Sequence, residues 1–93
     1  MGCIGKDNLD QLRKNLFGIL CDKEKNDNKW ERTLENVLIE VKGYFDLTND
    51  SSFTKLLSKL SVVKMLNMKY FRRTILDCMN ICSRLQDEKG KGI

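Results

Sequence analysis

The stretch from Ser52 to Gln86, SFTKLLSKLSVVKMLNMKYFRRTILDCMNICSRLQ, decides the fold of this 93-residue chain. Two sets of apolar residues recur in it at the three-and-four spacing of a half-buried helix. The first set is Phe53, Leu56, Leu57 and Leu60, and the second is Phe71, Ile75, Cys78, Met79, Cys82 and Leu85. Between the two sets, the apolar residues are spread too evenly for one helix face: Val62, Val63, Met65, Leu66 and Met68.

One helix through this whole stretch would be roughly 50 Å long, at 1.5 Å per residue. A chain of this size cannot bury such a rod, so we expect breaks near Ser61 and Lys69. The stretch therefore predicts a helix, a short buried helix and a third helix, over residues 51–60, 62–68 and 70–86.

Two further helices are expected upstream, over residues 8–21 and 29–46. Asn8 with Gln11, and Asn28 with Glu31, have the spacing of capping boxes. The apolar face of the first helix is Leu9, Leu12, Leu16, Ile19 and Leu20, and that of the second is Trp30, Leu34, Val37, Leu38, Val41, Tyr44 and Phe45. These faces have only each other to bury against, which predicts an all-α, compact bundle of four to five helices.

The rest of the chain suggests one domain over residues 8–86, a flexible N-terminus over 1–7 and a disordered tail over 87–93. Hydrophobic residues make up 41% and charged residues 32% of the chain, which is too apolar for a disordered protein. The net charge of +4 is carried by interleaved charges, so we expect at most weak polyanion binding. No apolar run is long enough to span a membrane.

The four cysteines, Cys3, Cys21, Cys78 and Cys82, follow no secretory signal. We therefore expect free thiols and an intracellular compartment. Cys78 and Cys82 lie four residues apart on an apolar stripe, and buried thiols are a better explanation of that spacing than a zinc site. The chain has no histidine and no glycine-rich phosphate loop. We therefore expect no enzyme activity, no metal and no cofactor.

A basic cluster stands out at Lys64, Lys69, Arg72 and Arg73. One interpretation is a solvated collar at the junction of two helices. The other is a contact with an acidic peptide or a phosphate. Lys69, Arg72 and Arg73 fall within the first turn of the last expected helix, where cations oppose the helix dipole. This unfavourable interaction with the helix dipole has no evident structural benefit, so a binding partner is worth considering.

The segment from Leu56 to Leu85 resembles the N-terminal domain of the elongation factor TFIIS, a family that also includes elongin A and Mediator modules. The integrase-binding domain of LEDGF-type chromatin proteins is a related helical bundle. The resemblance rests on Leu56-Leu57, Leu60-Ser61-Val62-Val63, Met65-Leu66, Phe71-Arg72-Arg73-Thr74-Ile75 and Cys78. Upstream, Leu20-Cys21-Asp22 is similar to the hydrophobic-then-aspartate pair that LEDGF-type domains present in their first interhelical loop.

The resemblance implies a nuclear, non-catalytic domain that docks short disordered motifs of transcription-elongation or chromatin factors. It implies that Asp22 accepts hydrogen bonds from the backbone of a partner. Leu20, Cys21, Asp22, Lys64, Lys69, Arg72 and Arg73 are then the candidate partner-binding residues. The charges at the rim of a groove would fix the register of the motif.

Two alternatives from other functional classes remain open. The first is a self-assembly module of unknown oligomeric state, in which the off-stripe residues Ile39, Leu76 and Ile81 form a subunit contact. The second is a polyanion-binding or lipid-anchored adaptor. The anchor would use acyl chains on Gly2 and Cys3, although Lys6 stands where myristoylation signals prefer Ser or Thr.

Overall fold

The computed structural model describes residues 6–91, with side chains from Asp7 to Asp87. Four α-helices follow one another, namely α1 (Lys6–Glu24), α2 (Lys29–Thr48), α3 (Ser51–Ser61) and α4 (Met68–Lys91). A short 3-10 helix, η1 (Val63–Met65), joins α3 to α4, and residues 6–91 contain no strand. The predicted all-α bundle is confirmed, and so is the interruption between the last two long helices. The short buried helix expected over residues 62–68 is wrong, because η1 has only three residues and Met65 is exposed, which leaves Val63 as its buried residue. The expected lipid sites, Gly2 and Cys3, lie outside the described residues.

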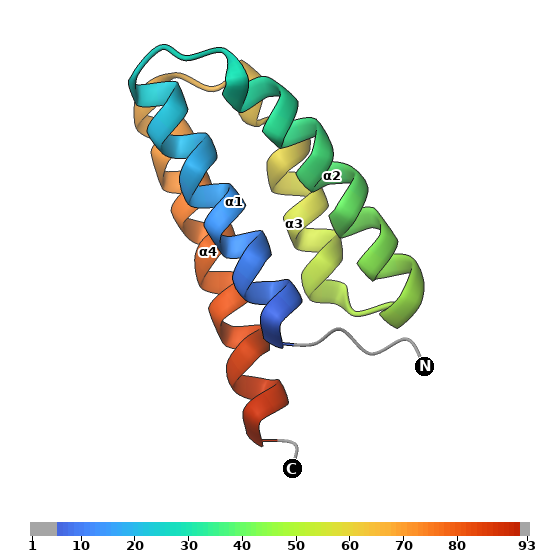
Figure 1. The fold of residues 1–93 in the computed structure, drawn as a ribbon. Coiled ribbons are helices and arrows are strands. Elements are labelled where there is room, and N and C mark those ends of the chain that lie inside the picture. The colour runs from blue at the N-terminus through green and yellow to red at the C-terminus, as the bar shows by residue number, and fades with distance from the viewer. Residues whose placement is uncertain (1–5, 92–93) are drawn as a thin grey trace.

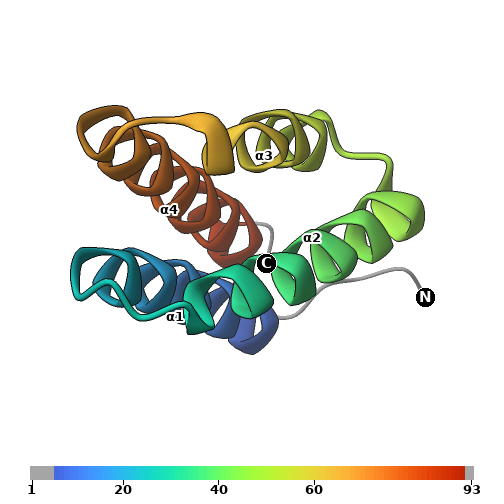
Figure 2. The same ribbon diagram turned by 90° about the horizontal axis from the view of Figure 1, so that it is seen from above.

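The helices alternate in direction and form a ring. α1 packs against α2 and α4, and α3 packs against the same two helices. Figure 1 shows α1 beside α4 and α2 beside α3, with the α1–α2 turn and the link into α4 at one end. The view along the bundle places both connections at that same end (Figure 2). Segments far apart in sequence, the end of α1 and the start of α4, are thereby brought together.

α1 and α4 exceed their predicted bounds the most. α1 begins at Lys6 and continues to Glu24, beyond the expected 8–21. α4 continues to Lys91, into the stretch expected to be a tail. In both cases the added residues include Lys and Glu, which favour helices even where no apolar stripe remains. The end of a stripe marks the end of burial, and a helix continues past it.

The helix ends use other caps than the expected capping boxes. Asn8 lies inside α1, and Gln11 donates to the Asn15 side chain over 3.1 Å instead of reaching back. At α2, Asn28 makes no side-chain cap, and the Asp27 carboxylate accepts the Lys29 N–H over 3.0 Å. At α2, the loop aspartate therefore acts one residue before the asparagine that the spacing indicated.

The α2–α3 connection is short because a cap closes each end of it. Asn49 adopts a left-handed conformation with φ of 55°, and its N–H bonds the Phe45 carbonyl over 2.7 Å. Asp50 then caps α3 by accepting the Ser52 N–H over 2.9 Å. Asparagine and aspartate tolerate these conformations with little strain, so the chain reverses within two residues.

The core gathers apolar side chains from all four helices. Its most fully buried members are Phe71, Leu9, Leu12, Leu16, Ile19, Leu34, Leu56, Leu60, Ile75, Val37 and Val41. Cys78 and Cys82 are also fully buried, as the stripe predicted. Ile81 is only 5% exposed and therefore differs from Ile39 and Leu76, which are exposed. α4 packs between α1 and α3, so its buried arc is wider than one stripe and takes in Ile81.

Candidate functional site

An open groove lies at the end of the bundle where the α1–α2 turn meets the η1–α4 link. Its volume is about 430 Å³, which is within the usual range for ligand sites. We call it the junction groove, and its lining residues are Lys23, Glu24, Asn26, Leu66, Asn67, Met68 and Arg72. Both walls come from the connections grouped at one end of the bundle in Figures 1 and 2.

The start of α4 is fixed by a side-chain cap. The side-chain Oδ1 of Asn67 accepts the Tyr70 N–H over 3.2 Å, and this contact sets where the first turn begins. From that turn, Arg72 donates to the Glu24 carboxylate over 2.8 Å. This ion pair ties the start of α4 to the end of α1 across the groove. Both partners are about half exposed, so the contact is available to solvent and to a ligand.

Two aromatic rings lie next to the groove, under its lining residue Lys23. Trp30 and Phe71 meet edge to face, with centroids 5.3 Å apart and an interplanar angle of 86°. The Lys23 ammonium lies 4.7 Å from the Trp30 ring centroid and 5.5 Å from that of Phe71. The indole N–H of Trp30 has no hydrogen-bond partner among the described residues, so it is left to solvent. The chain's one tryptophan therefore lies next to the groove.

The predicted residues at the end of α1 take different environments. Leu20 is buried in the core, while Cys21 and Asp22 are half-buried. The Asp22 backbone carbonyl accepts the N–H groups of Lys25 and Asp27, over 3.2 and 2.8 Å, and so closes the turn. The Asp22 carboxylate has no ion-pair partner within residues 7–87.

The predicted basic cluster is divided by the fold. Arg72 lines the junction groove, but Lys64 approaches Glu35 of α2, with Nζ and Oε1 3.8 Å apart. Lys69 and Arg73 are exposed, and neither forms an ion pair with any described side chain. The structure thus brings Arg72 to Glu24 at the end of α1 and directs Lys64 toward α2. Of the seven predicted partner-binding residues, Arg72 is the one that lines the junction groove.

Six of the seven groove residues were not predicted as site residues, and among these six Lys23 and Glu24 carry charges. Both were assigned to a loop after residue 21, and nothing in the sequence marks Glu24 as the partner of Arg72, 48 positions later. Leu66 and Met68 belong to the evenly spread apolar residues between the two helical stripes. The structure explains the even spread, because these residues lie in the link between α3 and α4 and at the start of α4, and not on one helix face. Val63 turns into the core, while Leu66 and Met68 remain half-buried along the groove.

The buried thiols are poorly suited to chemistry. Burial is the main cause that raises the pKa of Cys78 to about 12, with a smaller contribution from Cys82. Burial likewise raises the pKa of Cys82 to about 11. Both therefore stay protonated near neutral pH, and a thiol is a far weaker nucleophile than a thiolate. Among the described side chains, no three cysteines and carboxylates converge as metal ligands would.

No helix in the described part of the chain combines the length and hydropathy that crossing a membrane requires. In comparisons with known proteins, the chain matches no family model, no curated protein and no solved structure.

Proposed function

We propose that this domain is a non-catalytic interaction module that holds a short linear motif of another protein in the junction groove. The single observation behind the proposal is the composition of that groove. Half-buried Leu66 and Met68 lie in it together with the charges of Lys23, Glu24 and Arg72. Peptide-docking grooves combine apolar side chains, which give affinity, with charged side chains, which give register, and this groove offers both kinds.

The surroundings of the groove favour a motif with an apolar anchor and acidic flanks. Met65 is 80% exposed and Tyr70 49% exposed, and both flank the link that forms one wall. Lys69 and Arg73, which lack ion-pair partners among the described residues, add positive charge at the start of α4. Burying one exposed large apolar side chain contributes about 1.5–3 kcal/mol, so two anchors supply a substantial part of a micromolar affinity.

The resemblance to TFIIS N-terminal and LEDGF-type domains supplies the finer proposal. In that proposal the partner is a disordered segment of a transcription-elongation or chromatin factor, and the domain works in the nucleus. The half-buried Asp22 would then accept a backbone N–H of the motif, as the resemblance implies.

A peptide titration tests the proposal, with Trp30 as the reporter because it lies under Lys23 beside the groove. We expect a saturable change in fluorescence, and amide shifts at Asp22–Asn26 and Leu66–Arg72, with short peptides that carry Leu or Phe beside Asp and Glu. Peptides with the same anchor and basic flanks should bind more weakly, and the difference should shrink as salt is added.

Matched variants locate the binding. Met68→Ala and Lys69→Glu should weaken binding severalfold. Ile39→Ala and Lys42→Glu, which change an exposed apolar residue and an exposed lysine on α2, should leave it unchanged. If no acidic-apolar peptide shifts the groove amides, or if the α2 variants matter equally, the proposed function is wrong.

A further inference from the structure

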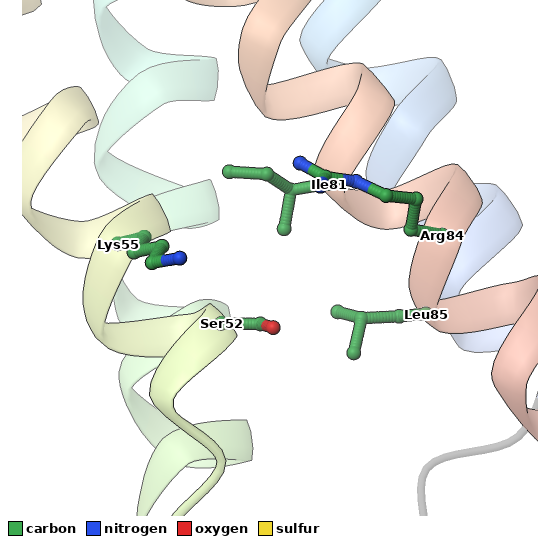
Figure 3. A pocket seen from close by; sticks show the side chains of 5 residues that line it. All are labelled: Ser52, Lys55, Ile81, Arg84 and Leu85. Atoms are coloured by element: carbon green, nitrogen blue, oxygen red, sulfur yellow. The ribbon is translucent and has the colours of Figure 1, made fainter.

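A second cleft opens between α3 and α4, toward the other end of α4 from the junction groove. Its volume is about 70 Å³, and its lining residues are Ser52, Lys55, Ile81, Arg84 and Leu85. Figure 3 shows Ser52 and Lys55 on the α3 wall, facing the side chains that α4 directs toward them. We call it the α3–α4 cleft. Ile81 and Leu85 are each only 5% exposed, so two of the lining residues are apolar and nearly buried.

Two positive charges converge on this cleft from opposite walls. In Figure 3 the Lys55 ammonium extends from α3 and the Arg84 guanidinium from α4, both into the space between the helices. Among side chains 7–87, no carboxylate forms an ion pair with either. Asp50, the cap of α3, accepts the Ser52 N–H. Converging like charges repel each other, and an anion between them turns that repulsion into attraction.

The size and charge of the cleft indicate the chemical class of the anion. Pockets for whole small molecules usually hold about 300–1,000 Å³, so this cleft has room for one small charged group. A phosphate group carries about −1.5 to −2 charges near pH 7, which matches two cations better than a single carboxylate does. A guanidinium presents paired N–H donors to phosphate oxygens, and the Ser52 hydroxyl adds a third kind of donor.

We propose that the α3–α4 cleft binds a phosphate group between Lys55 and Arg84. Ile81 and Leu85 would exclude water from one side of the ligand, which would strengthen its contacts with the two cations. This site shares no residue with the junction groove. A negative result for phosphate binding would therefore leave the proposed peptide docking unaffected, and the reverse also holds.

An NMR titration with inorganic phosphate, near neutral pH and at constant ionic strength, tests this site. We expect saturable amide shifts confined to residues 52–55 and 81–85, with roughly millimolar affinity. Lys55→Gln and Arg84→Gln should each lower the affinity about tenfold, which is the usual effect of losing a charge-assisted hydrogen bond. Both residues are exposed, so the variants should fold, and circular dichroism checks this.

Three further arms complete the experiment. Lys42→Gln removes an exposed lysine from α2 and should leave phosphate binding unchanged. Acetate, with one charge, should bind several times more weakly than phosphate. O-phosphoserine separates the two sources of the ligand. Affinity equal to that of free phosphate supports a phosphate ester, and binding of phosphate alone supports a free ion. Shifts that do not saturate, that spread over the surface, or that respond equally to Lys42→Gln would overturn the proposal.

Discussion

The two sides of α4 are joined to their neighbours in different ways. Toward α1, Arg13 donates to Ser83 over 3.0 Å at one end, and Arg72 donates to Glu24 over 2.8 Å at the other. Eleven residues separate these positions on both helices, so the antiparallel register is constant over about three turns. Toward α3, the ion pair between Lys59 and Asp77 is 3.8 Å long, and beyond it the helices part into the α3–α4 cleft.

The difference teaches where this fold can accept a ligand. We call the contact surface between two helices a seam. The α1–α4 seam joins a 19-residue helix to α4, and polar contacts hold it at both ends. The 11-residue α3 covers less of α4, and two cations without described acidic partners face each other there. We expect the α1–α4 seam to stabilise the bundle and the α3–α4 seam to open first.

Truncating a leucine in each seam should give the largest difference. Leu12 of α1 is fully buried, whereas Leu85 of α4 lines the cleft. Leu12→Ala should lower the free energy of unfolding by about 3–5 kcal/mol, and Leu85→Ala by about 2 kcal/mol, because water and neighbouring side chains fill a gap beside a cleft more readily. Urea unfolding followed by Trp30 fluorescence measures both. Equal losses would remove the distinction between the seams.

Alkaline pH should destabilise the bundle through the two thiols between the seams. An unperturbed thiol ionises near pH 9.0, but the pKa of Cys78 in the fold is about 12 and that of Cys82 about 11. As the pH rises from 9 toward 12, the unfolded chain loses protons that the folded chain keeps. Stability is therefore fully present well below pH 9 and should fall by on the order of 5 kcal/mol by pH 11, since each thiol contributes about 1.4 kcal/mol per pH unit between its two pKa values. Tyr44, whose pKa burial raises to about 12, acts in the same direction above pH 10.

A series of urea melts between pH 8 and pH 11 checks this expectation. In the double variant Cys78→Ala, Cys82→Ala, the stability should vary much less with pH over this range. A slope unchanged by that substitution would show that other groups cause the loss.

The same thiols distinguish the seams kinetically. The charges of Lys59 and Asp77, at the α3 side, affect the pKa of Cys78. The charges of Arg13 in α1 and Glu40 in α2 affect the pKa of Cys82. If α3 detaches first, alkylation under native conditions should modify Cys78 about tenfold faster, equivalent to about 1.4 kcal/mol in opening free energy. Peptide mapping by mass spectrometry gives both rates. Faster modification of Cys82 would place the weaker seam at α1.

The smallest expected effects concern the two ion pairs. Glu24→Gln should lower the free energy of unfolding by about 0.5–1 kcal/mol, because the contact to Arg72 is short, although partly exposed. Asp77→Asn, the matched carboxylate-to-amide change, should have an effect near zero. Double-mutant cycles with Arg72→Gln and Lys59→Gln isolate each pair. A larger coupling at Lys59 would reverse the comparison.

The sequence predicted what depends on periodicity and missed what depends on register. Leu56, Leu60 and Ile75 are buried as their spacing required, because side chains three or four positions apart share a helix face. The pairing of Glu24 with Arg72 depends on how α1 and α4 slide past each other, and local spacing carries no information about that. Ile81 was missed for a related reason, since only the position of α3 makes its flank of α4 interior.

Native-state hydrogen exchange tests the comparison most directly, because it measures opening free energies helix by helix. The amides of Phe53 to Leu60 in α3 should exchange through a local opening, at a free energy about 1–2 kcal/mol below that of global unfolding. The amides of Leu12 to Leu20 in α1 should exchange only on global unfolding. Equal opening free energies in α1 and α3 would contradict the account, since α4 would then be held equally on both sides.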